Sequence, residues 1–177
     1  MDNESLRNKF IALQSGDKIA FEEIYNHLKT PMYTIILRIT RDRSLSEDIL
    51  QEVFFKLYQS PPKAPIKNPR AYLFRMARNL AIDNVRKLPQ HAHWDSVENL
   101  VYLPLDDFLD DFSSKMDIDL AIKTLPLKES QIVSLRINGG LKFREISDVM
   151  DMPLGTVLWR YQKAIKQLRS ILSGGSA

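Results

Sequence analysis

Basic, aromatic and amide side chains between residues 63 and 87 are the groups in this chain best suited to specific chemistry. Arginine and lysine can neutralise phosphate, tyrosine can stack on a base, and asparagine can bond to base edges, a combination that suits single-stranded nucleic acid. A solvated helix face is the alternative interpretation of this segment. The residues are Lys63, Lys67, Arg70, Tyr72, Arg75, Arg78, Asn79, Arg86 and Lys87, with Asp83 as the single acid.

A second candidate set lies near the C-terminus, between Phe143 and Leu172. Two amphipathic helices are predicted there, broken at residues 152–155, and this is the outline of a helix-turn-helix whose second helix enters the major groove of DNA. An ordinary helical hairpin is the alternative. The candidate contacts lie off the apolar stripe of the second helix: Thr156, Leu158, Trp159, Arg160, Gln162, Lys163 and Lys166.

A third candidate surface is acidic and lies on a helix predicted to begin at Ser46. Serine can cap a helix, and the acids that follow it complement the helix dipole. The predicted core face takes Ile49, Val53, Phe54, Leu57 and Tyr58, which leaves Glu47, Asp48, Gln51, Glu52 and Phe55 on or near the other side. An exposed aromatic beside acids is either a half-buried core residue or a contact for a partner.

Catalytic and metal-binding chemistry has little support in the residue types. Cysteine is absent, so the chain forms no disulfide or thiolate metal site, which suits a reducing compartment. His91 and His93 could hold a metal, but two histidines in an acidic segment are more often solvated. Neither a glycine-rich phosphate loop nor a nucleophile in a recognisable setting is present. We therefore expect no enzymatic activity, no metal and no cofactor.

The bulk properties fit a helical protein that meets a polyanion at two places. The 177 residues carry a net charge of +3, but residues 63–87 and the last helix are basic while residues 95–119 are acidic. The chain has no apolar stretch near the roughly 20 residues that span a bilayer, and no signal-peptide core. We expect a cytoplasmic protein without membrane insertion.

The elements that must position these groups are predicted to be helices only. The expected fold is all-α, with small helical domains at 4–88 and 116–172, an acidic linker at 89–115 and a tail at 173–177. Breaks are expected near residues 15–17, 29–31 and 41–44. Prolines in the stretch 60–65 end one helix, and Pro69 opens the next in its first turn. No alternating run is long enough to build a sheet.

Taken in order, these pieces resemble a bacterial RNA polymerase sigma factor of the small extracytoplasmic-function (ECF) type, in the sigma-70 family. Three groups of motifs carry the resemblance: Glu47-Asp48 with Gln51, Glu52 and Phe54; Tyr72-Leu73 with Ala77, Asn79, Asp83 and Arg86-Lys87; and Leu125-Pro126, Glu145-Ile146 and Gly155-Thr156-Val157. Two positions depart from the pattern. Tyr72 stands where tryptophan is usual, and Leu158-Trp159 stands where a basic and a small residue are frequent.

A response-regulator type of transcription regulator is the competing family, because its helix-turn-helix has a similar Gly-Thr-Val. Such a protein carries an upstream doubly wound domain with parallel strands, for which this chain lacks the apolar runs. The sigma factor interpretation is therefore favoured.

The resemblance implies three partners: core RNA polymerase, promoter DNA and an anti-sigma protein. It implies that the helix with Glu47, Asp48, Gln51, Glu52 and Phe55 docks on the polymerase clamp, and that the helix-turn-helix residues read the duplex −35 element. The loop at 61–68 and the following helix would open the −10 element and hold its single strand. The residues implied for that role are Lys63, Lys67, Arg70, Tyr72, Arg75, Asn79, Asp83, Arg86 and Lys87.

Overall fold

A computed structural model of the chain describes residues 1–62, 66–87 and 120–174, and these residues form helices and short connections without a strand. The all-α prediction is confirmed. The helices are α1 (Asn3–Gln14), α2 (Lys18–Thr40), α3 (Arg43–Gln59), α4 (Pro69–Lys87), α6 (Leu127–Ile137), α7 (Phe143–Met150) and α8 (Leu154–Gly174), and residues 120–123 are helical too. Lys63 and the predicted linker at 89–115 lie outside the described residues.

The first three helices are separated by the turns that the sequence predicts, with one exception. Gly16 has a φ of +85°, and the Asp17 carboxylate accepts the backbone N–H groups of Ile19 and Ala20 at the start of α2. The break expected near Pro31 is wrong, because α2 continues through that residue. An interior proline costs about 3 kcal/mol. We attribute its tolerance to the apolar face of α2, which is buried on both sides of Pro31.

Helix α3 begins earlier than its predicted cap. Arg41 ends α2 in the left-handed conformation, with a φ of 56°, and the Asp42 carboxylate then accepts the Leu45 N–H at 2.9 Å. Ser46 is inside the helix and fully buried, with its hydroxyl 2.7 Å from that of Thr40. The prediction of Ser46 as the cap is therefore wrong, because the Asp42 side chain already accepts a free backbone N–H, that of Leu45, at the start of the helix.

The predicted pair of helices near the C-terminus is confirmed as α7 and α8. The Glu145 carboxylate accepts the Lys142 N–H at 2.7 Å at the start of α7, and Asp151 ends that helix with a φ of 52°. Before α7, the turn at Gly139 and Gly140 is tight, because a Cβ at Gly139 would lie 2.6 Å from the Leu135 carbonyl oxygen. Helix α8 runs to residue 174, two residues past its predicted end.

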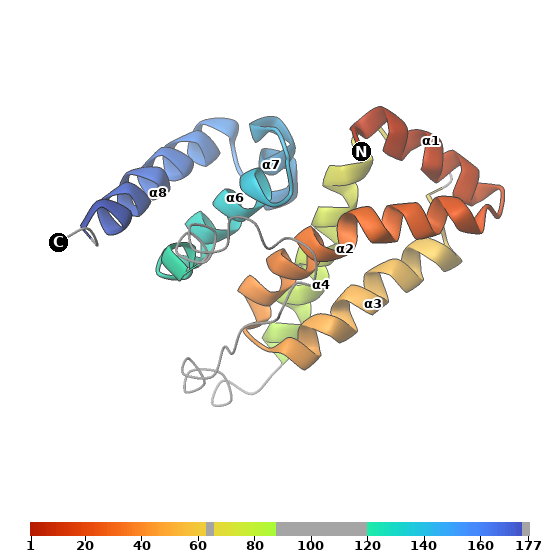
Figure 1. The fold of residues 1–177 in the computed structure, drawn as a ribbon, viewed down its shortest axis with the longest axis horizontal. Coiled ribbons are helices and arrows are strands. Elements are labelled where there is room, and N and C mark those ends of the chain that lie inside the picture. The colour runs from red at the N-terminus through yellow and green to blue at the C-terminus, as the bar shows by residue number, and fades with distance from the viewer. Residues whose placement is uncertain (63–65, 88–119, 175–177) are drawn as a thin grey trace.

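The N-terminal half (residues 1–87) and the C-terminal half (residues 120–174) pack directly against each other (Figure 1). Helix α6 contacts α2, and α7 contacts α4. One buried cluster is continuous across both halves, joining residues such as Ile35 and Leu73 to Ile132 and Ile146. The sequence predicted two domains with a linker between them, and gave no sign of this shared core.

A smaller cluster belongs to the C-terminal half alone and holds α8 to the elements before it. Its buried members are Ala121, Ile122, Leu125, Val133, Ala164 and Leu168. Because α8 packs on this cluster, its opposite side faces outward. Among the described helices, none is long and apolar enough to span a membrane.

Candidate functional site

The acidic residues predicted on α3 border an open groove between α2 and α3. The groove has a volume of about 700 Å³, and Asp48, Gln51, Glu52 and Phe55 line it together with aromatic side chains. Phe55 is 57% exposed, as expected, while Glu47 is exposed on the same helix but does not line the groove. Glu52 bonds to Lys56 at 2.7 Å. The groove therefore combines carboxylates with an unusually exposed ring.

The aromatic part of this groove was only partly foreseen from the sequence. Phe21 of α2 packs edge-to-face on Tyr58 of α3, with ring centroids 5.1 Å apart. Tyr25 of α2 packs in the same way on Phe54 of α3, with centroids 4.8 Å apart. Tyr58 is exposed rather than on the core face. Phe21 and Tyr25 are four residues apart on one helix face, and this spacing could have predicted that both rings line the same surface. Edge-to-face packing fixes these rings, so the groove is preformed.

Helix α4 presents one outward stripe that holds most of the predicted single-strand contacts. Arg75, Asn79, Asp83, Arg86 and Lys87 are all exposed. Successive members of the set 75, 79, 83 and 87 are four residues apart, so they lie along one side of the helix. A charged and amide-bearing surface is thus available to a ligand.

Tyr72 lies one turn before this stripe and is half-buried. Its ring packs against Phe10 of α1 in an edge-to-face arrangement, with centroids 6.5 Å apart and planes at 83°. One side of the tyrosine is therefore held by the protein. Aromatic rings are the side chains on which bases of single-stranded nucleic acid stack.

Arg70, also predicted to contact single-stranded DNA, instead faces the C-terminal half. Its Nη1 donates to the Gly139 carbonyl at 2.8 Å, and its Nη2 donates to the Met1 carbonyl at 2.7 Å and lies 3.0 Å from His27 Nε2. Burial lowers the pKa of Arg70, and the Glu145 carboxylate opposes that shift. In this structure its donors are used inside the protein.

Arg78 of α4 lies outside the outward stripe and also makes an inward contact. Its Nε donates to the Gln131 side-chain oxygen of α6 at 3.1 Å. Burial lowers its pKa, while Asp151 opposes the shift. Together with the bond from the Asn3 amide to Glu145, at 2.7 Å, these contacts form a polar rim around the shared core.

Residues 66–68, which lead into α4, are held by α1. Lys67 has an exposed side chain, while its backbone carbonyl accepts a hydrogen bond from Arg7 at 2.8 Å. Lys67 is therefore free to meet a phosphate. Lys63, predicted for the same role, lies outside the described residues.

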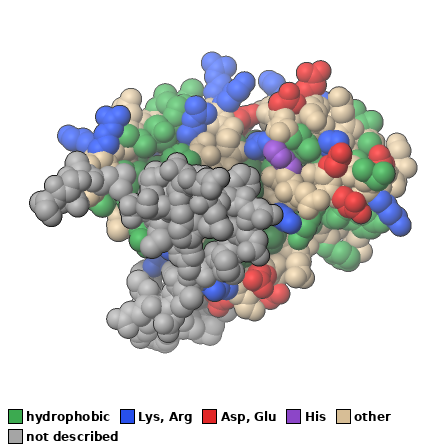
Figure 2. Space-filling model, in the orientation of Figure 1, with side chains coloured by type: hydrophobic (Ala, Val, Ile, Leu, Met, Phe, Trp, Pro, Cys, Tyr) green, Lys and Arg blue, Asp and Glu red, His purple; other side chains and the backbone are tan. Residues whose placement is uncertain are grey.

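The outward face of α8 contains most of the predicted duplex contacts. Leu158, Trp159, Gln162, Lys163 and Lys166 are exposed, whereas Thr156 is half-buried. Trp159 is 56% exposed, and Lys163 Nζ lies 5.3 Å from its ring centroid. Figure 2 shows lysine and arginine side chains over the end of the molecule formed by α8.

Arg160, predicted with this set, is turned toward the C-terminal core. Its Nη1 pairs with Glu129 Oε1 at 2.6 Å, and Glu129 is only 4% exposed. Its guanidinium also lies 5.8 Å from the Trp159 ring centroid. A buried carboxylate requires such a partner. Arg160 therefore stabilises α8 on α6 in this structure.

Two family comparisons match the halves that carry these surfaces. A profile of sigma-70 region 2 matches residues 24–89, and a profile of sigma-70 region 4 matches residues 121–170. Together they span well over half of the chain. The chain belongs to the sigma-70 family. It is thus a sigma factor, a transcription initiation factor, as the motifs predicted, and α3 and α4 fall in region 2 while α6 to α8 fall in region 4.

Whole-length relatives support the same assignment. The sigma factor is 28% identical over 166 residues to the ECF RNA polymerase sigma factor SigK of Mycobacterium bovis, covering 88% of this chain and 87% of the relative. It is 26% identical over 181 residues to the ECF sigma factor SigW of Bacillus subtilis, covering 94% and 96%. These matches confirm the predicted ECF type.

Solved structures share the fold of this sigma factor. CnrH, determined in complex with the cytosolic domain of CnrY, has a TM-score of 0.68 and 16% identity, covering 97% of this chain and 99% of that one. RpoE of Bartonella quintana, determined with the anti-sigma factor NepR, has a TM-score of 0.70 and 18% identity, covering 86% and 96%.

The candidate metal ligands among the described residues are histidine and carboxylate side chains. Residues 1–62, 66–87 and 120–174 contain no group of three or more His, Asp or Glu side chains placed to hold an ion. His91 and His93, the candidate ligands in the sequence, lie outside those ranges.

Proposed function

We propose that this sigma factor directs core RNA polymerase to promoters by three separate contacts: the α2–α3 groove on polymerase, α4 on the −10 element and α8 on the −35 element. The outward stripe of α4, with Arg75, Asn79 and Asp83 at four-residue spacing, carries the proposal. It places charge and an amide on an exposed helix in the half matched to region 2.

The groove is suited to a protein partner. Protein interfaces rely on aromatic anchors surrounded by polar residues. Phe55 and Tyr58 provide exposed rings, and Asp48, Gln51 and Glu52 provide the polar border. A basic surface on polymerase would complement these carboxylates.

Helix α4 is proposed to hold the nontemplate strand of the −10 element while the duplex opens. Unstacking a base costs a few kcal/mol, and each base stacked on an aromatic ring returns about 1–3 kcal/mol. Tyr72 provides the ring, Arg75 and Arg86 neutralise phosphate, and Asn79 bonds to a base edge. Capture of the single strand thereby offsets the cost of melting without hydrolysis.

Helix α8 is proposed to read the duplex −35 element in the major groove. Lys163 and Lys166 would contact phosphates, Gln162 a base edge, and Leu158 with Trp159 the apolar groups of the groove, such as a thymine methyl. Reaching two separate promoter elements requires the halves to move apart. The contacts of Arg70 and Arg78 would then be released, and both arginines would become available to DNA.

An anti-sigma protein is proposed as the regulator, because RpoE, which shares the fold, was determined with one. The groove on α3 and the stripe on α4 are both exposed while the halves are packed together. An inhibitor could therefore cover either surface directly. Since RNA polymerase works in the cytoplasm, the proposal places this protein there.

Run-off transcription with core polymerase and a promoter library tests the proposal. We expect the chain to co-purify with core enzyme and to initiate at a distinct promoter set. Phe55→Ser should weaken core binding at least ten-fold, because an interface anchor is lost. Ile19→Ser is the matched control, since Ile19 is an exposed apolar residue of α2 outside the groove. Absence of core binding by the unmodified chain would refute the proposal.

A further inference from the structure

Trp159 lies at the middle of the outward face of α8. Each residue of an α-helix turns by about 100°, so Trp159 is about 200° from the fully buried Val157, on the opposite side of the helix. Helix α8 begins at Leu154, which places Trp159 in its second turn. Recognition helices present the residues near their N-terminus to base edges. Trp159 is therefore placed where a duplex would meet this helix.

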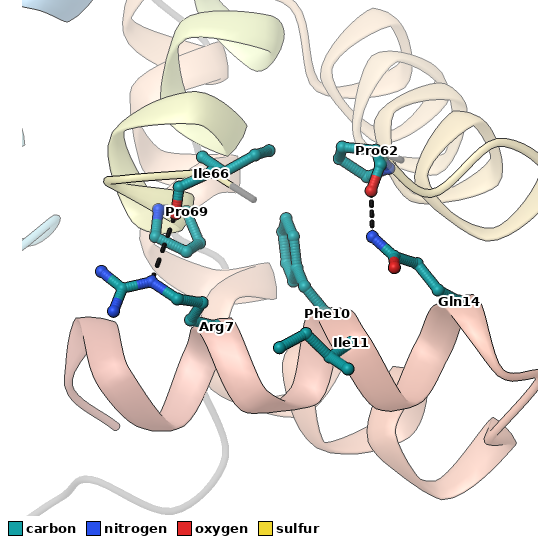
Figure 3. Close-up of a pocket in the computed structure, with 7 residues that line it drawn as sticks. All are labelled: Arg7, Phe10, Ile11, Gln14, Pro62, Ile66 and Pro69. Carbon is teal, nitrogen blue, oxygen red and sulfur yellow. Dashed lines mark hydrogen bonds between the residues drawn. The ribbon is translucent and has the colours of Figure 1, made fainter. Parts of the chain in front are cut away.

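Two other aromatic rings that lie beside an arginine are more enclosed than Trp159. Phe10 of α1, one turn from Arg7, is only 3% exposed (Figure 3). Phe143, whose ring centroid is 5.0 Å from the guanidinium carbon of Arg136, is half-buried. Tryptophan is highly buried on average in proteins. The exposure of Trp159, at 56%, indicates a surface that binds a ligand.

Arg160 lies beside the exposed ring and is itself fixed by an ion pair. Its guanidinium carbon is 5.8 Å from the ring centroid of Trp159, within the range of a cation–π contact. Its Nη1 pairs at 2.6 Å with Oε1 of Glu129, a residue of the first turn of α6 that is only 4% exposed. The pair therefore connects the exposed ring of α8 to a buried anchor on α6.

Lys163 also lies near the Trp159 ring, but no comparable anchor fixes it. Its Nζ is 5.3 Å from the ring centroid, and its side chain is exposed. Lysine carries a compact charge on a flexible stem, whereas arginine has a planar guanidinium that stacks on aromatic faces. When Lys163 turns to a phosphate, as proposed above, Arg160 is the cation that stays beside the ring.

The chemistry of the indole suits one particular group of the major groove. Tryptophan has a single N–H donor and otherwise an apolar surface, so it cannot bond to a base edge by two hydrogen bonds. The apolar group that marks a base in the major groove is the C5 methyl of thymine. Exposed lysines at 163 and 166 give the same face a positive charge, which favours DNA over a protein partner.

We propose that Trp159 reads the methyl group of one thymine in the −35 element, and that Arg160 and Glu129 are positioning residues that hold its ring in place. The proposal rests on the function proposed above, because it requires α8 to bind the −35 duplex. Arg160 acts through the ring and does not touch DNA. A residue predicted from the sequence as a DNA contact is thus assigned a supporting role.

Fluorescence anisotropy of Trp159 in the free protein tests whether the ion pair holds the ring. The chain has two tryptophans, so Trp94→Phe leaves Trp159 as the single reporter. In that background, Arg160→Met should raise the amplitude of the nanosecond motion of the ring about two-fold. Arg160→Lys should give most of that increase, because lysine lacks the planar fork that meets the Glu129 carboxylate and the ring together.

Arg136→Met is the matched control for loss of an internal arginine. Arg136 belongs to the same half, donates to the Leu141 carbonyl at 2.9 Å and lies over the ring of Phe143. A general loss of stability would affect both variants, whereas a positioning role predicts faster motion of Trp159 only when Arg160 is changed. Equal motion of Trp159 in the Arg136 and Arg160 variants would overturn the positioning role.

Duplexes in which each −35 thymine is replaced in turn by deoxyuridine test the reading of the methyl group. The full chain is used with core polymerase, on a promoter found by run-off transcription. Replacement at one position should weaken binding about four-fold, the change expected from exposing one buried methyl group. Trp159→Ala should abolish this difference, Arg160→Met should remove most of it, and Arg136→Met should keep it. The proposal is wrong if deoxyuridine has no effect at any position.

Two further outcomes would overturn the proposal. If Arg160 contacts phosphate, Arg160→Lys would behave like the unmodified chain and Arg160→Met would lower the salt slope by about one. If Trp159 contacts a protein, Trp159→Ala would leave the relative affinities of all duplexes unchanged. Failure of the unmodified chain to bind any promoter with core polymerase would refute the proposed function as well, a result distinct from defects confined to the Trp159 and Arg160 variants.

Discussion

Helices α4 and α8 are both basic, and each is the proposed DNA contact of its half. They differ in how their cationic side chains bond to other parts of the protein. In α4, Arg70 and Arg78 face the C-terminal half, and the cations that remain exposed lie on one stripe. In α8, one arginine pairs with Glu129, and its lysines are exposed. The side of α8 that we propose to face DNA is open, whereas part of α4 is covered.

The difference follows from the chemistry of the two cations. Arginine carries a planar fork that bonds to carbonyls and carboxylates in fixed directions and is easier to desolvate, while lysine keeps a compact, strongly hydrated charge. All three inward contacts named above are made by arginine. Counting the basic residues of these two helices therefore overestimates how many of them are available to a ligand.

Gly139→Ala should produce the largest effect, because the Gly139 carbonyl accepts the hydrogen bond from Arg70 on the covered side of α4. The new Cβ would lie 2.6 Å from the Leu135 carbonyl oxygen, and the turn that supplies the acceptor of Arg70 would shift. We expect a loss of about 2 kcal/mol in the free energy of unfolding, typical of overpacking. Urea denaturation measures it.

Gly155→Ala is the control, because a Cβ at Gly155 of α8 meets no atom within 4 Å. This substitution should leave stability unchanged or raise it by a few tenths of a kcal/mol. Equal destabilisation by the two changes would show that the turn at Gly139 is no more constrained than the open start of α8.

Asn79→Ala tests the exposed stripe of α4. Loss of a base-edge contact made only by the single strand should reduce promoter opening about ten-fold and leave duplex binding nearly unchanged. Permanganate footprinting and duplex binding assays measure the two quantities. An equal loss in both would remove the special role of the stripe in opening.

Lys163→Ala tests the exposed side of α8 with a smaller expected effect. A lost phosphate contact should weaken −35 binding about three-fold and reduce the salt slope by about one. Arg160→Met is the comparison, since Arg160 pairs with Glu129. It should lower stability and leave the slope unchanged. The same slope for Lys163→Ala and the unmodified chain would exclude a phosphate contact at Lys163.

Acidification should slightly lower the free energy of unfolding through His27, whose Nε2 lies 3.0 Å from Arg70 Nη2 on the covered side of α4. Burial, followed by nearby positive charges that include Arg70, lowers the pKa of His27. The unfolded chain therefore binds a proton at His27 more readily than the folded chain does. The contribution of His27 to the free energy of unfolding is complete above about pH 6.5 and is lost as the pH falls below that value. Thermal unfolding at pH 7.5 and 5.5 should show a shallow loss that His27→Gln reduces. An unchanged difference in that variant would contradict this role.

Local patterns were sufficient to predict the helices and most of the exposed surfaces. Apolar spacing and turn residues located the helix-turn-helix and the acidic face of α3, because both signals are local. The same reasoning failed at Pro31 and Ser46. There, packing of α2 outweighed a proline, and Asp42 supplied a cap one turn before the serine.

Contacts between distant residues could not be predicted. Arg70 and Gly139 are 69 residues apart, and nothing in either local pattern indicates that they meet. Arg70 and Arg75 are also both arginines of one amphipathic helix, and the sequence around them does not tell them apart. Which arginine stays exposed depends on where the other half of the chain packs, and that information lies outside any window of sequence.

The first residues of the chain are joined to both halves, which bears on how the protein should be handled. The Met1 carbonyl accepts a hydrogen bond from Arg70, and the Asn3 amide bonds to Glu145 at the start of α7. In contrast, the far end of α8 points away from the other helices (Figure 1). An affinity tag or fluorescent fusion placed directly before Met1 would disturb the contact between the halves. The same label attached after α8 would report on the undisturbed protein.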